Sequence, residues 1–370
     1  MGMTNAVEHD KWTEIKIHVP IKDIETAENI ANMVVPYGIY VEDYSSLEQE
    51  VDEIAHIDLI DLSVLLIMIV AGLAVADDEN FDFNATLKLA ENGDAEAQNR
   101  IGVAYNNGEG VEQNYSEAMK WYLKSAEQNY PYAFDNLGSM YQNGLGVEQS
   151  DEKAFEYYSK GAEFGMIRSL NELGFYYENG IAVEKDEQKA LELYIKATEN
   201  GDSIPQYNVG RMYINGFGTE QDYSKGAEWL EKSAAQENAY ALRTLGYLCQ
   251  NGLGVKKDTA RAFELYTKAA EQGDAISQNN LGTMYEDGIF VKRNRNKAIE
   301  WFKKSAEQGY PTAFRNLGVT YENGMTSKSQ KSRDWNRKKA IEWYTKAAEQ
   351  DDDQDIKAEA QEALKRLGTN

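Results

Sequence analysis

Residues 98–110 read QNRIGVAYNNGEG, and versions of this stretch recur through most of the chain. An apolar anchor residue followed by glycine returns every 36 residues, at Ile101-Gly102, Leu137-Gly138, Leu173-Gly174, Val209-Gly210, Leu245-Gly246, Leu281-Gly282 and Leu317-Gly318. A second glycine follows six residues after the first in each copy. A fixed period in this range indicates stacked supersecondary units that bury their apolar faces against their neighbours. The sequence therefore predicts a helical repeat protein.

Each unit is expected to form two helices, A and B. In the second unit, the pattern predicts helix A over about residues 130–143, a loop at residues 144–147 and helix B over about residues 151–164. The glycine beside the anchor lies inside helix A, where glycine costs about 1 kcal/mol relative to alanine. We therefore expect that its missing side chain lets a neighbouring helix approach.

The loop between helices A and B reads Gly-x-Gly in units one, two, four and five. The first glycine follows Asn or Asp, as expected of a left-handed residue just past a helix end. The second glycine is replaced by Ala182, Phe290 and Thr326 in units three, six and seven. We expect the loops of these three units to follow a different path.

The chain divides into three parts by its patterns, giving a mostly α protein: an α/α solenoid with a small α+β head. Residues 1–61 predict a β-α-β head, because alternation at residues 12–18 and 39–41 flanks helical spacing at residues 23–35. An apolar helix and acidic linker follow over residues 62–82. Residues 83–370 predict the solenoid, with about seven repeats and end caps, the last of them a polar helix over residues 355–368.

The formal net charge is −24, which argues against non-specific binding to nucleic acid or to an anionic membrane. The acidic excess is largest over residues 1–82, and the sign reverses locally in residues 292–297 and 328–339. Such basic runs are usually solvated faces, and the alternative is a site for an anion or a partner.

Cys249 is the only cysteine and stands where the other units have tyrosine, so we expect it to be a core residue. A single cysteine also fits a reducing compartment, so we expect a cytoplasmic location.

Residues 62–76 read LSVLLIMIVAGLAVA and carry no charge. A membrane-spanning helix needs about 20 apolar residues, so a buried helix that covers the first repeat is favoured. A short membrane anchor is the alternative, which would make the protein membrane-associated. The N-terminus lacks the basic and apolar regions of an ordinary signal peptide.

The two sides of helix A differ in how their residues vary between units. At 100° per residue, the anchor and positions three and four away on either side share one face, which predicts the core. Positions two and five away on either side share the opposite face, and their residue types change from unit to unit. Tyrosine and arginine there are typical of binding interfaces, although they could instead pack along the solenoid surface. The predicted partner-binding residues are Tyr132, Arg168, Phe175, Tyr207, Arg211, Tyr240, Arg243 and Tyr247.

The sequence offers no catalytic constellation. Its three histidines, His9, His18 and His56, all lie in the head and lack metal-ligand spacing. The Gly-x-Gly strings follow a helix and lack the third glycine of a nucleotide-binding loop. We therefore expect no enzyme activity, no catalytic residue, no cofactor and no bound metal.

The repeated pattern Ala-x-x-x-Leu-Gly-x-x-Tyr-x-x-Gly-x-Gly-Val, then Ala-x-x-Trp-Tyr-x-Lys-x-Ala-Glu-Gln-Gly, resembles the Sel1-like repeat family, which is related to tetratricopeptide repeats. The resemblance covers about residues 83–368. It implies an α/α superhelix whose A helices line a concave, partner-binding surface. Some extracellular relatives carry disulfides across each repeat, and this chain has none.

The head resembles a different family. WTEIKIHVP, NIANMVVPYGIYVEDYSSLEQE and EIAHIDLID are similar to the N-terminal domain of ribosomal protein L11 methyltransferases, over residues 11–61. The resemblance implies a ferredoxin-like domain that helps to recognise the ribosomal protein. No S-adenosylmethionine-binding domain is recognisable after it, so methyltransferase activity is not expected.

The leading hypothesis is a non-enzymatic scaffold or adaptor that binds a peptide or protein along the concave helix-A surface. Arg168, Arg211 and Arg243 suggest a partner with some acidic character. One alternative is a ribosomal-protein-recognition module fused to a scaffold, and another is a membrane-tethered scaffold.

Overall fold

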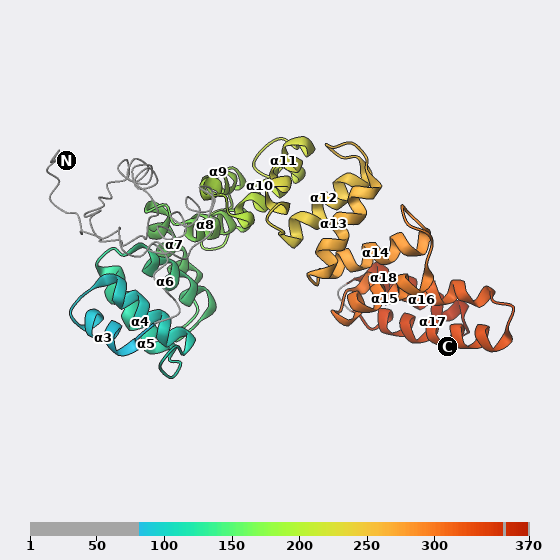
Figure 1. Cartoon of the computed structure of the whole chain (residues 1–370), viewed down its shortest axis with the longest axis horizontal. Helices are drawn as coiled ribbons and strands as arrows, with labels where there is room; N and C mark the ends of the chain where they lie inside the picture. Colours follow the sequence, from blue (N-terminus) through green and yellow to red (C-terminus); the bar gives the residue numbers. More distant parts are fainter. Residues whose placement is uncertain (1–80, 351–352, 369–370) are drawn as a thin grey trace, which may run out of the picture. The chain divides into compact units, whose positions relative to one another are not determined.

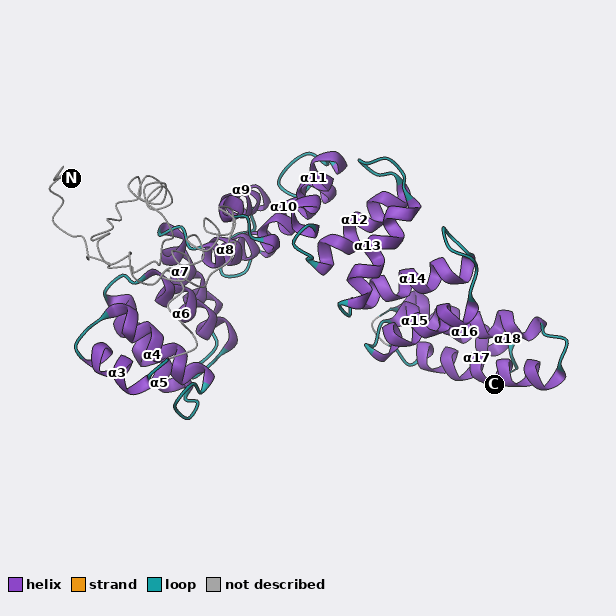
Figure 2. Cartoon of the chain, viewed as in Figure 1, coloured by secondary structure: helices purple, strands orange, loops and turns teal. Residues whose placement is uncertain are grey.

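The computed structural model describes residues 81–350 and 353–368, which contain α helices and two short 3₁₀ helices but no strand. Figures 1 and 2 show these helices in chain order. The residues from Asp82 onward form one compact unit. This confirms the predicted helical repeat solenoid. The predicted β-α-β head and the apolar segment at residues 62–76 lie outside the described residues.

The helices alternate between A and B. The A helices are α4 (Ala95–Asn107), α6 (Pro131–Asn143), α8 (Ile167–Asn179), α10 (Ser203–Asn215), α12 (Ala239–Asn251), α14 (Ala275–Asp287) and α16 (Pro311–Asn323). The B helices are α5 (Tyr115–Glu127), α7 (Asp151–Glu163), α9 (Glu187–Ala197), α11 (Tyr223–Ala234), α13 (Thr259–Glu271), α15 (Arg295–Glu307) and α17 (Gln330–Ala348). A B-like helix, α3 (Phe83–Glu91), precedes them and α18 (Gln354–Arg366) follows, while the 3₁₀ helices are η3 (Thr198–Asn200) and η4 (Gly324–Thr326).

Each A helix packs on the B helix of its own repeat, and that B helix packs on the next A helix. Successive A helices also touch directly, as α6 touches α8 and α14 touches α16. The predicted core face is confirmed in α6, where Ala133, Phe134, Leu137 and Met140 are buried. Tyr141 on the same face is half-buried and stacks on a tyrosine of α7.

The glycine beside the anchor makes room for a ring of helix B. A Cβ atom on Gly138 would lie 2.6 Å from the ring of Tyr158, and one on Gly174 would lie 2.7 Å from the ring of Tyr194. In the fourth repeat, a Cβ atom on Gly210 would lie 3.0 Å from both the Gly226 carbonyl oxygen and the Leu230 side chain. The close approach predicted for this glycine is therefore confirmed, and an aromatic ring fills the space in most repeats.

The loops of the third and sixth repeats do not take the different path that we expected. Ala182 and Phe290 adopt φ angles of 57° and 63°, close to the 71° of Gly146 in the second repeat. The loop hydrogen bonds are also kept, since Ile181 N donates to Tyr176 O at 3.0 Å as Leu145 N donates to Met140 O at 2.9 Å. The prediction was wrong there because non-glycine residues hold the left-handed conformation.

The seventh repeat does depart from the others, as expected. Gly324 at the end of α16 has φ −72°, and the chain continues into η4 instead of turning left-handed. Helix α17 then runs for 19 residues, whereas α15 has 13. The six additional residues of this repeat thus lengthen helix B. The predicted polar helix near the C-terminal end is present as α18, which packs on α17 and α16.

Cys249 lies in the core, as predicted from its place in the repeat. Its side chain is buried among residues of α12 and α13, and burial raises the pKa of the thiol. A buried thiol of raised pKa is a poor nucleophile. The cytoplasmic location expected from cysteine usage stays a prediction. Within the described part of the chain, no helix has the length and apolar character needed to cross a membrane.

Candidate functional site

Exposed apolar side chains gather on one side of four consecutive A helices. They stand five residues before or two residues after the anchor of α6, α8, α10 and α12, and we call these positions the A-helix stripe. The exposed large apolar residues of the stripe are Tyr132 (57%), Phe175 (43%), Ile204 (54%), Tyr240 (56%) and Tyr247 (53%). Single exposed apolar residues are ordinary, but a set at equivalent positions of adjacent repeats forms a surface.

Three predicted residues come together where α10 meets α12. The rings of Tyr207 and Tyr240 lie 5.7 Å apart and are tilted by 35°. The guanidinium of Arg243 lies 5.2 Å from the Tyr240 ring centre. These contacts hold Tyr240 against its neighbours while more than half of its side chain faces solvent.

The three arginines predicted to bind a partner are engaged within the protein. Arg211 donates two hydrogen bonds of 2.6 Å to the carboxylate of Glu178, one repeat earlier. Arg243 donates a 2.7 Å hydrogen bond to Asp274, the residue that caps α14. Arg168 is exposed and donates to the Ser139 hydroxyl at 2.9 Å. Two of the three predicted positive charges are thus neutralised by ion pairs that join adjacent repeats.

The position two residues before the anchor is less exposed to solvent than expected. Asp135, which we predicted on the variable face, is only 6% exposed and accepts a hydrogen bond from the buried Ser169 hydroxyl. Burial raises the pKa of Asp135. The expectation failed because this position faces the next A helix. Amide pairs there link other repeats, in Asn99–Asn136 (3.0 Å), Asn171–Asn208 (2.8 Å) and Asn279–Asn316 (2.9 Å).

Sequence reasoning missed how helix B reaches the edge of the stripe. The buried tyrosine that packs on the A-helix glycine extends its hydroxyl to the residue five positions after the anchor. The bonds are Tyr158 to Gln142 (2.8 Å), Tyr194 to Glu178 (3.0 Å), Tyr266 to Gln250 (3.0 Å) and Tyr344 to Glu322 (2.8 Å). The signal was available, because a tyrosine recurs at this position with the 36-residue period in most repeats.

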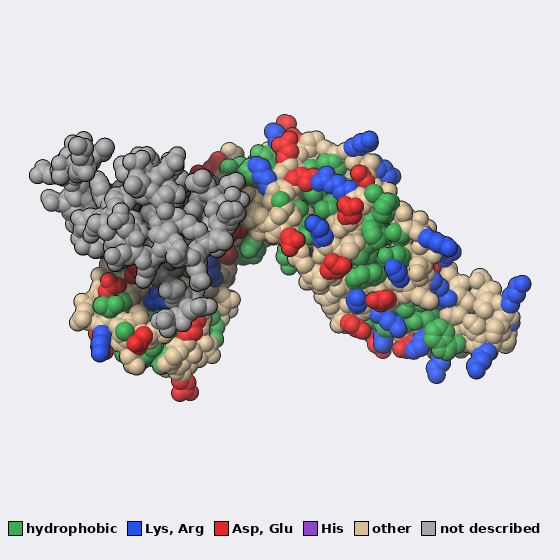
Figure 3. Space-filling view, viewed as in Figure 1, with side chains coloured by type: hydrophobic (Ala, Val, Ile, Leu, Met, Phe, Trp, Pro, Cys, Tyr) green, Lys and Arg blue, Asp and Glu red, His purple; other side chains and the backbone are tan. Residues whose placement is uncertain are grey.

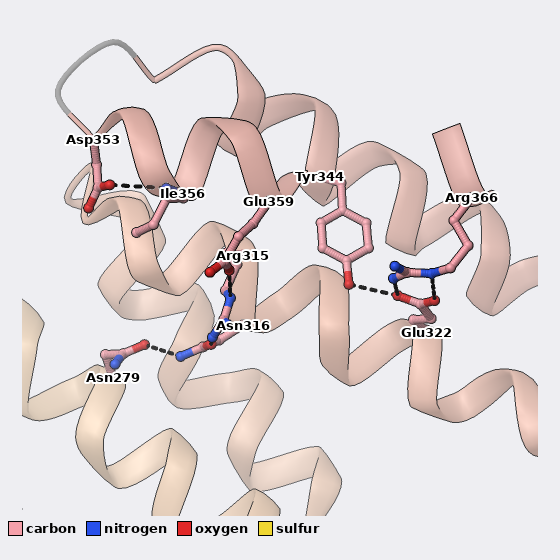
Figure 4. A network of polar contacts seen from close by, with 9 residues as sticks. All are labelled: Asn279, Arg315, Asn316, Glu322, Tyr344, Asp353, Ile356, Glu359 and Arg366. Carbon is pink, nitrogen blue, oxygen red and sulfur yellow. Dashed lines mark hydrogen bonds and ion pairs between the residues drawn. The ribbon is translucent and has the colours of Figure 1, made fainter. Parts of the chain in front are cut away.

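Figure 4 shows the same arrangement beside α18. The carboxylate of Glu322 on α16 accepts hydrogen bonds from Tyr344 of α17 and from Arg366 of α18. Arg315 on α16 likewise pairs with Glu359 of α18 at 2.8 Å. Helix α18 therefore engages α16 through ion pairs, as one A helix engages the next in the middle of the chain.

Among the described residues, no group of three or more His, Cys, Asp and Glu side chains could hold a metal ion. Acidic and basic side chains are interspersed over the face seen in Figure 3, with hydrophobic side chains between them. The exposed large apolar side chains of the stripe itself are mainly aromatic.

The fold is that of a helix-turn-helix repeat protein, and four of its neighbouring A helices carry exposed large apolar side chains. The Sel1 repeat family model matches seven segments, at residues 95–130, 135–165, 167–202, 206–238, 239–274, 275–310 and 313–352. The chain belongs to the Sel1 repeat family. Proteins of this family generally act as scaffolds for protein–protein interactions.

The solved structures similar to this chain include two that are at least 28% identical to it. One is c5321, a protective antigen of uropathogenic Escherichia coli with an SLR fold, at 30% identity over 78% of this chain and 68% of that one, with a TM-score of 0.52. The other is a Sel1 repeat protein from Oxalobacter formigenes, at 28% identity over 69% of this chain and 98% of that one, with a TM-score of 0.60. A search of curated proteins gives no match. The likeness of residues 11–61 to ribosomal protein L11 methyltransferases stays a prediction.

Proposed function

We propose that this protein is a non-enzymatic scaffold that binds a peptide or protein partner along the A-helix stripe, which we expect to lie on the concave side of the solenoid. The observation that carries the proposal is the alignment of five exposed large apolar side chains over α6, α8, α10 and α12. Half of the ten such side chains in the described chain stand at these equivalent positions. Leaving them in water is unfavourable, and covering them with a partner releases that cost.

The stripe has the residue types and the rigidity of a binding surface. Tyrosine and phenylalanine contribute large contact area with few rotatable bonds, and they dominate binding energies at protein interfaces. Ion pairs and amide pairs between repeats fix the positions from which these rings project. A partner therefore meets a surface that is already ordered, which lowers the entropic cost of binding.

The stripe suits an extended segment of limited length. Packed helices lie about 8–10 Å apart, so four successive A helices span roughly 30 Å. An extended chain rises about 3.3 Å per residue, so about nine residues cross the stripe. Arg211 and Arg243 already form ion pairs within the protein. We therefore expect the stripe to recognise its partner mainly through aromatic contacts, and the partner does not need to be acidic.

The test compares two variants of the full chain. One replaces Tyr132, Phe175, Tyr240 and Tyr247 with alanine, and the control replaces Leu89 and Phe290, which are each 57% exposed but lie off the stripe. Proteins captured from a lysate of the source cell are identified by mass spectrometry, after circular dichroism shows equal helix content. We expect specific captures to be lost with the stripe variant and kept with the control. Equal capture by the two variants would refute the stripe assignment.

A further inference from the structure

The two basic segments of the chain meet in the last repeats. Arg295, the first residue of α15, donates a 2.9 Å hydrogen bond to Asn336 of α17. The same guanidinium lies 5.7 Å from the ring centre of Tyr321, and Trp335 meets that ring edge-on at 5.5 Å. The start of α15 and the lengthened start of α17 are therefore neighbours. We call the exposed basic side chains of residues 292–297 and 328–339, together with Trp335, the basic patch.

The basic patch opposes the charge of the rest of the molecule. Residues 292–297 and 328–339 carry ten Lys and Arg side chains and one acid, Asp334, in a chain of net charge −24. Basic side chains project where α16 passes to α17 in Figure 3. Because salt screens charges beyond about 8 Å at physiological ionic strength, a short anionic ligand at this patch experiences mainly the local positive potential.

Some of the lysines lie in the first turns of α15 and α17, where the helix dipole also places partial positive charge. Neither α15 nor α17 has an acidic residue in its first turn, whereas Lys297 and Lys331 stand there. A helix N-terminus carries partial positive charge and favours anions, so cations at this end are unfavourable in the free protein. An anionic partner would relieve both the repulsion among the lysines and their conflict with the helix ends.

One face of α17 carries both positively charged side chains and an exposed apolar side chain. Lys331, Trp335 and Lys338 follow the i, i+4, i+7 spacing that places side chains on one helix face. Trp335 is 53% exposed, and both lysines are exposed. Within the described part of the chain, neither lysine forms an ion pair, although Lys339 beside them pairs with Glu342 at 2.7 Å. The six additional residues of this repeat supply most of this face.

We propose that the basic patch binds a short acidic segment of a partner protein, with an apolar side chain of that segment packed on Trp335. Charge complementarity selects acidic residues, and the exposed indole selects an apolar side chain between them. The negative charge elsewhere on the chain disfavours a long polyanion such as RNA, which would extend beyond the patch. This surface is separate from the A-helix stripe, so the proposal does not depend on the function assigned to the stripe.

The test measures binding of a fluorescein-labelled peptide of alternating glutamate and glycine around one phenylalanine to the full chain, by fluorescence anisotropy. The patch variants are Lys331→Gln with Lys338→Gln, and separately Trp335→Ala. The charge-matched control is Lys120→Gln with Lys160→Gln, on exposed faces of α5 and α7. We expect the double patch variant to bind about tenfold more weakly at low salt and the control to bind as the wild type does. Trp335→Ala should weaken binding at both low and high salt, because it removes an apolar contact.

Three outcomes would overturn the proposal. In the first, the peptide binds wild type and the double patch variant equally well, or the control loses as much affinity. In the second, a single-stranded RNA of equal charge binds more tightly than the peptide, which would make the patch a nucleic-acid surface. In the third, wild type self-associates at low salt, the double patch variant does not, and the peptide fails to compete, which would make a second copy of this chain the occupant. Equal helix content and equal thermal midpoints of the variants exclude misfolding as the cause.

Discussion

The phenolic hydroxyl of Tyr194 donates a 3.0 Å hydrogen bond to Glu178, which also receives two hydrogen bonds from Arg211. One carboxylate thus connects helix B of the third repeat, helix A of the same repeat and helix A of the fourth. Burial, together with the negative charge of Glu178, raises the pKa of Tyr194 well above its ordinary value. The tyrosine therefore remains a neutral donor across the physiological range.

Replacing Tyr194 with phenylalanine should destabilise the protein by about 1.5–3 kcal/mol, because the lost hydrogen bond is to a charged group. The ring itself is tolerated at this position, since Phe302 occupies it in the sixth repeat. The matched change Tyr158→Phe removes a hydrogen bond to the neutral Gln142 and should cost only about 0.5–1.5 kcal/mol. Urea unfolding followed by circular dichroism measures both losses. Equal losses would show that the charge of Glu178 adds nothing.

Removing the Arg211 side chain should leave Glu178, whose side chain is 11% exposed, without its charged partner. We expect Arg211→Ala to lower the free energy of unfolding by about 2–4 kcal/mol, because an unpaired and largely buried charge is costly. Adding Glu178→Gln to that variant should recover part of the loss, since the orphaned charge is then gone. A double-mutant cycle by urea unfolding measures the coupling. Strict additivity of the two changes would show that the pair contributes no coupling energy.

The repeating positions were predictable because each copy of the unit confirms the others. The period identified the anchor, the helix-A glycine and the buried face, as Leu137 and Gly138 illustrate. It also placed Cys249 in the core from the identity of its counterparts. These features depend on contacts that every repeat makes in the same way.

The contacts that differ between repeats were not predictable from one sequence. Tyr132, Phe175, Tyr240 and Tyr247 are exposed as predicted. The partners of Arg211 and Arg243, however, lie more than 30 residues away in the sequence. Asp135 was assigned to the exposed face because helical periodicity describes one helix and does not include the A helix that covers it. Phe290 holds a left-handed conformation that single-residue preferences disfavour, and it packs against Phe263.

Asp135→Asn should stabilise the protein at neutral pH. Burial raises the pKa of Asp135 in the folded state, despite the hydrogen bond from Ser169, so the native protein binds its proton more tightly than the unfolded chain does. Stability then falls as pH rises from the ordinary carboxyl pKa, about 3.9, to the raised value, and stays lower above it. The asparagine variant lacks this loss, and asparagine already occupies the equivalent position at Asn99, Asn171 and Asn279.

Urea midpoints of wild type and Asp135→Asn, measured between pH 3 and pH 7, test this prediction. The advantage of the variant should be present at pH 7 and vanish near pH 3, where both chains are neutral at this position. The control Glu264→Gln removes a carboxylate from an exposed side chain of α13 and should show no such trend. A constant difference across the range would mean that ionisation of Asp135 does not influence stability.

Gly218, in the loop of the fourth repeat, lies against the backbone of the third repeat. It has φ +66°, and a Cβ atom there would overlap the backbone carbonyl of Glu187 at the start of α9. Gly165 has a similar φ of +75° but has no neighbouring atom within 4 Å of a built Cβ. Alanine at either position bears the same left-handed penalty of about 1–2 kcal/mol, so the two substitutions differ mainly in the clash.

We expect Gly218→Ala to cost about 1–3 kcal/mol more than Gly165→Ala, because a backbone atom can give way only if adjacent repeats shift. Ala182 shows that the left-handed conformation itself is accessible to alanine in a loop of this kind. Urea unfolding gives the two free energies, and amide hydrogen exchange should show faster opening of α9 and α10 only in Gly218→Ala. Equal destabilisation by the two substitutions would show that the contact with Glu187 does not hold the third and fourth repeats together.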